Sequence, residues 1–96
     1  MIEIRETAVF SAWLDSLRDA QARVRIQARI LRLRHDNAGD VKPVGEGVSE
    51  MRIDCGPGYR VYYVKRGLLL VFLLAGGAKP TQDKDIKTAL KLARML

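Results

Sequence analysis

The chain has 96 residues, 48% of them hydrophobic and 29% charged, which excludes two ordinary domains and predicts one domain with one core over residues 1–96. Its 17 lysines and arginines exceed its 11 acidic residues and give a net charge of +6, which favours nucleic acids or other polyanions as partners. The single cysteine, Cys55, excludes an intrachain disulfide, and the single histidine, His35, excludes a pair of catalytic histidines.

A short strand and a helix are predicted at the start of the chain. Ile2 and Ile4 alternate with charged residues, as in a strand, and Thr7 is a suitable N-cap for the helix that follows. The apolar residues of this helix recur at positions i, i+3, i+4 and i+7, and they form one stripe. They are Phe10, Trp13, Leu14 and Leu17.

A second helix is predicted from its N-cap Asp19 to about Arg34. Helical spacing places apolar residues on two opposite sides of it and a row of arginines between them. Such a helix either packs between the sheet and the neighbouring helix or keeps one side for a partner chain, and we expect the first arrangement. The arginine row is expected to be a solvated face. The three groups are Val24, Ala28 and Leu31; Ile26, Ile30 and Leu33; and Arg25, Arg29 and Arg32.

Three strands are predicted after a loop that contains Pro43, Gly45 and Gly47. The first strand begins at Val48 and alternates between a core face and a polar face, and a Gly-Pro-Gly turn separates it from the second, residues 59–65. A hairpin at Arg66 and Gly67 leads to residues 68–74, which are continuously apolar and predict a strand buried on both faces. On the first strand, the core face holds Met51, Ile53 and Cys55, and the polar face holds Glu50, Arg52 and Asp54.

A last helix is predicted after a turn at Gly76 and Gly77, with Thr81 as its N-cap and acidic residues in its first turn. The predicted order is β-α-α-β-β-β-α. We therefore expect an α+β fold in which two N-terminal helices pack on one face of an antiparallel sheet and the other face is at least partly open.

The candidate functional residues form a group of cations. Arg52 and Arg60 occur on adjacent predicted strands, and Lys79 follows the next strand. Guanidinium groups hold phosphate through paired hydrogen bonds and stabilise negative charge that develops in a transition state. The alternative is that Arg52 pairs with Glu50 or Asp54 and that Arg60 only covers the sheet. His35 is expected to cap a helix, and Cys55 to be a small strand residue.

Two stretches of the chain resemble a known family. Residues 47–63 carry a Glu-x-Arg pattern followed by Gly-x-Gly-Tyr-Arg-Val, and residues 76–86 carry Lys-x-x-Gln-Asp. This combination resembles the HigB-like addiction module killer branch of the RelE/ParE superfamily, and the predicted helices fall in their family places as well. The resemblance implies the RelE/ParE-like fold and a role as the toxin of a type II toxin–antitoxin system.

In RelE-like members, a ribose 2′-hydroxyl of the mRNA attacks the adjacent phosphate in the ribosomal A site. The resemblance therefore implies a metal-independent endoribonuclease without a cofactor, in the cytoplasm, whose partners are the ribosome, mRNA and a helix-turn-helix antitoxin that forms a hetero-oligomer with it. By position, the catalytic residues would be Arg60, Arg52 and Lys79, and the RNA-binding residues would be Tyr62, Gln82 and Asp83.

Two alternatives stay open at the level of the sequence. A ParE-like protein of similar fold inhibits DNA gyrase without cleaving RNA, and a related small basic domain could bind RNA or a partner without cutting. Here a long terminal helix stands where RelE members carry a C-terminal arginine and tyrosine. The resemblance consequently assigns no general base. Neither a signal peptide nor a membrane-spanning segment is expected.

Overall fold

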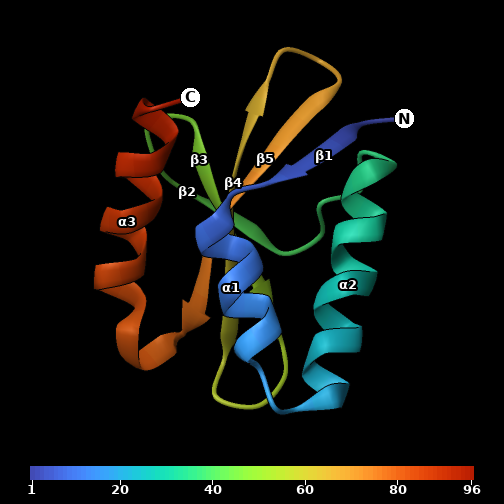
Figure 1. Cartoon of the computed structure of the whole chain (residues 1–96). Helices are drawn as coiled ribbons and strands as arrows, with labels where there is room; N and C mark the ends of the chain where they lie inside the picture. Colours follow the sequence, from blue (N-terminus) through green and yellow to red (C-terminus); the bar gives the residue numbers. More distant parts are fainter.

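The computed structural model describes all of residues 1–96 and shows an α+β fold, as predicted (Figure 1). None of its helices combines the length and apolar character needed to cross a membrane. The elements, in chain order, are β1 (Glu3–Glu6), α1 (Ala8–Ser16), α2 (Ala20–Arg34), β2 (Val41–Gly45), β3 (Val48–Ile53), β4 (Tyr59–Arg66), β5 (Leu70–Ala78), a 3₁₀ turn η1 (Lys79–Thr81) and α3 (Gln82–Arg94).

The sheet has five strands in the order β1-β5-β4-β3-β2, and β1 runs parallel to β5. The predicted sheet was fully antiparallel, and β2 was interpreted as a loop because of its proline and glycines. As an edge strand, β2 tolerates Pro43. Glu46 and Gly47, both with positive φ (54° and 81°), connect it to β3 in a tight hairpin.

The two N-terminal helices pack on one face of the sheet, as expected. Their predicted N-caps are confirmed, because the Thr7 hydroxyl accepts from the Phe10 amide at 3.0 Å and the Asp19 carboxylate accepts from two amides of α2. The core between helices and sheet is centred on Phe10, Ile26 and Met51.

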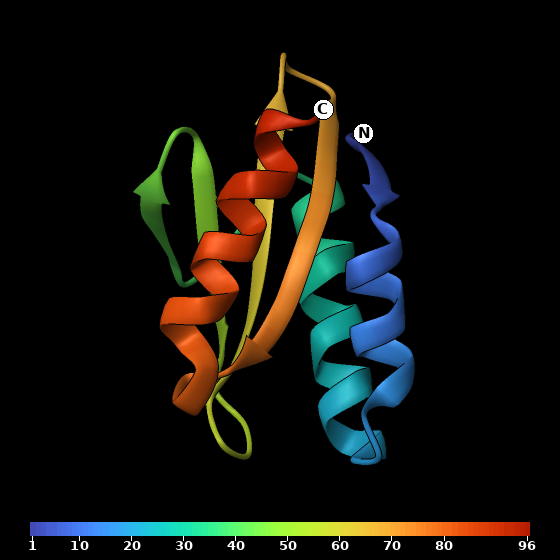
Figure 2. The same cartoon turned by 60° about the vertical axis from the view of Figure 1, so that its left-hand side comes forward.

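The opposite face of the sheet is covered by α3, which corrects the prediction of an open face (Figure 2). Ala89 and Ala93 of α3 pack against Tyr62 and Leu74 of the sheet, and all four are buried. Small residues let the helix approach the sheet closely, and the first residue of α3, Gln82, donates a hydrogen bond to Glu50 of the sheet. The sheet is therefore the middle layer between helices.

Strand β5 extends further than predicted, to Ala78, and contains Gly76 and Gly77, which the sequence suggested as a turn. A Cβ atom on Gly76 would overlap the ring of Trp13, and one on Gly77 would overlap the carboxylate of Asp85. These glycines serve close packing on both faces of the strand. At its other end, Leu68 lies in the exposed β4–β5 hairpin and is 83% exposed, which contradicts the predicted burial there.

One side of α2 has no intramolecular partner. Val24 is 65% exposed and Leu31 is 57% exposed, so the expectation that apolar packing covers both sides of this helix is wrong. Only the side with Ile26 and Leu33 enters the core.

Candidate functional site

The pairing of β3 with β4 brings the candidate residues together at one end of the sheet. Arg52 lies directly opposite Arg60, and Glu50 lies directly opposite Tyr62. Because side chains alternate along a strand, these four residues share the face that α3 covers. Gln82, the first residue of α3, reaches the same place. We call Glu50, Arg52, Arg60, Tyr62 and Gln82 the Glu50 cluster.

Glu50 is the centre of this cluster. It is 1% exposed, and its Oε2 accepts hydrogen bonds from the Tyr62 hydroxyl at 3.1 Å and from Gln82 Nε2 at 2.8 Å. Its other oxygen, Oε1, has no hydrogen-bond partner. A buried carboxylate needs nearby positive charge, and the two arginines supply it: Arg52 Nε lies 3.8 Å from Oε1 and Arg60 Nε lies 3.9 Å from Oε2.

The two arginines differ in exposure. The side chain of Arg60 is 11% exposed and its Nη1 donates to the carbonyl of Gly58 in the Gly-Pro-Gly turn. The side chain of Arg52 is 44% exposed. The open face predicted for the sheet implies a solvent-exposed Arg60, and the structure contradicts this because the turn encloses its side chain on the face that α3 covers. Arg60 is thus a fixed guanidinium and Arg52 an accessible one.

An open pocket of about 260 Å³ lies beside the arginines. Its walls include Arg52, Arg60, Gly58 and Tyr59. Two guanidinium groups at the wall of one pocket suit an anion with several oxygens, such as a phosphate. Asp40 and Asp54 also line this pocket and balance the charge of the two arginines, so the pocket would hold an anion through directed hydrogen bonds more than through net charge.

Tyr62 is fully buried and acts as a donor. Burial raises the pKa of its phenol well above the ordinary value of 10.0, and the charge and hydrogen bond of Glu50 raise it further. The phenol therefore stays protonated at neutral pH and accepts no proton there. The structure places Tyr62 beneath the site, where it orients Glu50, and not at a surface where it would stack on a base.

The remaining predicted site residues lie at the rim. Lys79 is exposed at the start of η1, next to Gly58, whose Cβ position would lie 3.6 Å from Lys79 Cβ. The side chain of Asp83 is exposed and makes no hydrogen bond or ion pair, whereas Gln82 is half-buried in the Glu50 cluster. The sheet and η1 thus bring five of the six predicted residues close to one another, and Asp83 faces outward.

Two further residues belong to the site. Sequence patterning identified Glu50 only as a partner for Arg52, and Asp85 only as a charge in the first turn of a helix. Asp85 packs over Gly77 and accepts a hydrogen bond from the Thr81 hydroxyl at 2.6 Å. The adjacent glycine was the available signal, because a glycine inside a strand often marks a close approach. His35 lies far from the cluster, in a pocket with Leu68 at the opposite end of β4.

Comparison with known proteins identifies a relative whose description names no activity. No protein-family model matches the chain, and no solved structure matches it. A protein of Haemophilus influenzae (strain Rd), described as an uncharacterized protein, is 50% identical over 95 residues, which cover 99% of this chain and 96% of the relative. The chain therefore belongs to the same protein family as this Haemophilus influenzae protein.

Proposed function

We propose that the chain is the toxin of a type II toxin–antitoxin system and cleaves mRNA on the ribosome. The observation that carries the proposal is the cross-strand pair Arg52 and Arg60, held around a buried carboxylate at the wall of an open pocket. A guanidinium that is already oriented needs no rearrangement as charge develops on a phosphate. The proposal agrees with the family resemblance of residues 47–63 and 76–86.

In the proposed reaction, the ribose 2′-hydroxyl loses its proton to solvent and its oxygen attacks the adjacent phosphorus, the bond from phosphorus to the 5′-oxygen breaks, and the 5′-oxygen takes up a proton. The products are a 2′,3′-cyclic phosphate and a 5′-hydroxyl. Arg60 would stabilise the negative charge on the phosphate, Arg52 would hold a non-bridging oxygen, and Lys79 would lie near the leaving oxygen. Glu50, Tyr62 and Gln82 would act as positioning residues, because they fix the orientation of the arginines.

The cluster offers no accessible proton acceptor. The arginines are cations, Tyr62 is protonated, and Glu50 lies beneath the other side chains. Outside the cluster, the exposed carboxylates of Asp40 and Asp54 line the adjacent pocket. Alignment of nucleophile, phosphorus and leaving oxygen can lower a barrier by roughly 7–11 kcal/mol, and we propose that binding on the ribosome supplies this alignment. This is why we propose a ribosome-dependent reaction. Neutralisation by a helix-turn-helix antitoxin belongs to the same proposal.

The test is cleavage of a synthetic mRNA by the purified protein, with and without programmed ribosomes that have an empty A site. Cleavage is expected only with ribosomes, and Arg52→Gln is expected to slow it by about 10²–10³-fold. Lys91→Gln, on the exposed face of α3, is the control with the same loss of charge and should cleave normally. Equal cutting of naked RNA would refute ribosome dependence, and no cutting in either case would refute the ribonuclease.

A further inference from the structure

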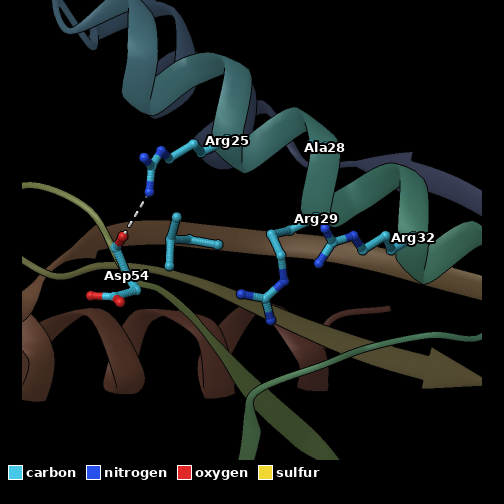
Figure 3. Close-up of a pocket in the computed structure, with 6 residues that line it drawn as sticks. Arg25, Ala28, Arg29, Arg32 and Asp54 are labelled. Carbon is cyan, nitrogen blue, oxygen red and sulfur yellow. Dashed lines mark hydrogen bonds between the residues drawn. The ribbon is translucent and has the colours of Figure 1, made fainter.

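A second group of cations lies on the other side of the sheet. Arg25, Arg29 and Arg32 project from one side of α2 over the end of β3, and with Ala28, Ile53 and Asp54 they line an open pocket of about 250 Å³ (Figure 3). We call the three arginines the arginine row. A solvated face was expected here, whereas the structure shows a pocket wall.

Contacts within the chain hold part of this row in place. Arg25 Nη1 donates to the carbonyl of Asp54 at 3.1 Å (Figure 3). Arg29, which is half-buried, donates to the carbonyls of Arg52 and Asp40 and to that of Ala38 at 2.9 Å. Two of the three side chains are therefore oriented before any ligand binds, which reduces the entropy lost on binding.

None of the three arginine side chains has a charged partner. The guanidinium groups of Arg25 and Arg29 donate only to backbone carbonyls, and that of Arg32 makes no hydrogen bond. All the ion pairs of the chain involve other residues. Like charges at helical spacings of three and four residues repel one another. A bound anion would relieve this repulsion.

The arginine row is continuous with the Glu50 cluster around the end of β3. Ile53 and Asp54 line both the pocket of the arginine row and the pocket beside Arg52 and Arg60. On the β2 side of β3, strand pairing reaches only Met51, and the Asp40 carbonyl accepts from the Arg52 amide at 3.0 Å. This edge has no strand partner at Ile53 and Asp54. A flexible chain could pass around this edge from one pocket to the other.

We propose that the arginine row binds backbone phosphates of single-stranded RNA beyond the cleavage point. The proposal rests on the proposed function, because it extends the same RNA path from the α3 face to the α2 face. Arg25 and Arg32 are about 10 Å apart along the helix axis at 1.5 Å per residue, which suits a chain with repeated charges better than a single anion. The Asp54 carboxylate at the junction of the two pockets repels phosphate. Removing its charge should therefore strengthen RNA binding, whereas removing the arginines should weaken it.

The experiment measures binding of a labelled single-stranded RNA of about 12 nucleotides, within the usual site size of such proteins, as a function of salt. Each lost phosphate contact reduces the slope of log K against log salt by about 0.7. Arg25→Gln with Arg32→Gln should therefore reduce the slope by about 1.4 and weaken binding by about 25-fold near 0.1 M salt. Lys87→Gln with Lys91→Gln on α3 removes the same charge and should keep the slope. Asp54→Asn should tighten binding.

A second arm measures binding to ribosomes that carry no mRNA, and circular dichroism checks the fold of each variant. A loss with free RNA supports the proposal, because it identifies the messenger as the source of the phosphates. A loss confined to ribosomes that carry no mRNA would identify ribosomal RNA as the ligand and would overturn the proposal. If neither affinity changes but binding of poly-glutamate falls, the site takes acidic proteins and the proposal is wrong. If the variant with Arg25→Gln and Arg32→Gln binds RNA as well as the wild-type protein does, and the wild-type protein cleaves mRNA, only this inference is overturned. If the variant loses RNA binding as expected but the wild-type protein cleaves no mRNA, only the proposed function is overturned.

Discussion

Replacing Glu50 by glutamine tests whether the buried carboxylate holds the cluster together. The substitution keeps the shape of the side chain but removes the charge that faces Arg60, whose side chain is 11% exposed. Breaking a buried ion pair by removing one partner costs roughly 3–5 kcal/mol. We expect about 3 kcal/mol, the lower end of that range, because the amide oxygen still accepts a hydrogen bond from Tyr62 or Gln82. Urea unfolding, followed by the fluorescence of the single tryptophan, measures this loss.

A double-mutant cycle separates the ion pair from other effects. Arg60→Met alone leaves a buried carboxylate with less positive charge around it, whereas Glu50→Gln with Arg60→Met removes both charges. The double variant should be more stable than the sum of the single losses predicts, by about 1–2 kcal/mol. Glu46→Gln, which breaks the exposed pair with Arg94, is the control and should change stability little. Additivity within about 0.5 kcal/mol would refute the coupling between Glu50 and Arg60.

Three further predictions concern packing, pH and catalysis. Trp13 packs on Gly76 and lies beside Phe10 and Tyr59, with ring centroids 5.9 and 6.2 Å away, so Trp13→Ala should destabilise the fold by about 3 kcal/mol; an unchanged melting temperature would contradict this packing. Because burial raises the pKa of Tyr62 above its unfolded value of 10.0, the stabilisation from the protonated phenol is complete below pH 10 and is lost as pH rises further. Melting curves from pH 8 to 11 should show a decline that is smaller in Tyr62→Phe, and equal declines would exclude this phenol. Lys79→Ala should lower the single-turnover cleavage rate more than ribosome affinity, and equal losses would make Lys79 a binding residue.

The helices and most strands could be predicted because local patterns determine them. Thr7 and Asp19 precede apolar periods of helical spacing, and the alternation from Val48 to Ile53 indicates a strand with two different faces. Strand β2 could not be predicted, because its only stabilising partner is β3 and its own residues are typical of a loop. The role of Gly76 depends on Trp13, which approaches from a helix distant in sequence, and that of Gly77 depends on how α3, with Asp85, folds back over the strand.

The candidate site could be predicted in part. Alternation correctly placed Glu50 with Arg52 on one strand and Arg60 with Tyr62 on the next. The register of β3 and β4 then sets Arg52 opposite Arg60 and Glu50 opposite Tyr62. Burial of the face that these residues share could not be predicted, because it follows from the docking of α3 through Ala89 and Ala93. Once α3 covers the face, Glu50 changes from a surface charge to the centre of the cluster.

The most direct test of the central claim is a map of mRNA 5′ ends in cells after brief induction of the chain. We expect new 5′ ends within translated codons for the wild-type protein and for Lys91→Gln, and their loss in Arg52→Gln. Because Arg52 also faces the buried Glu50 carboxylate, circular dichroism must first show that the Arg52→Gln variant is folded. Growth inhibition by the wild-type protein without new 5′ ends, or new ends that persist in a folded Arg52→Gln variant, would contradict the central claim.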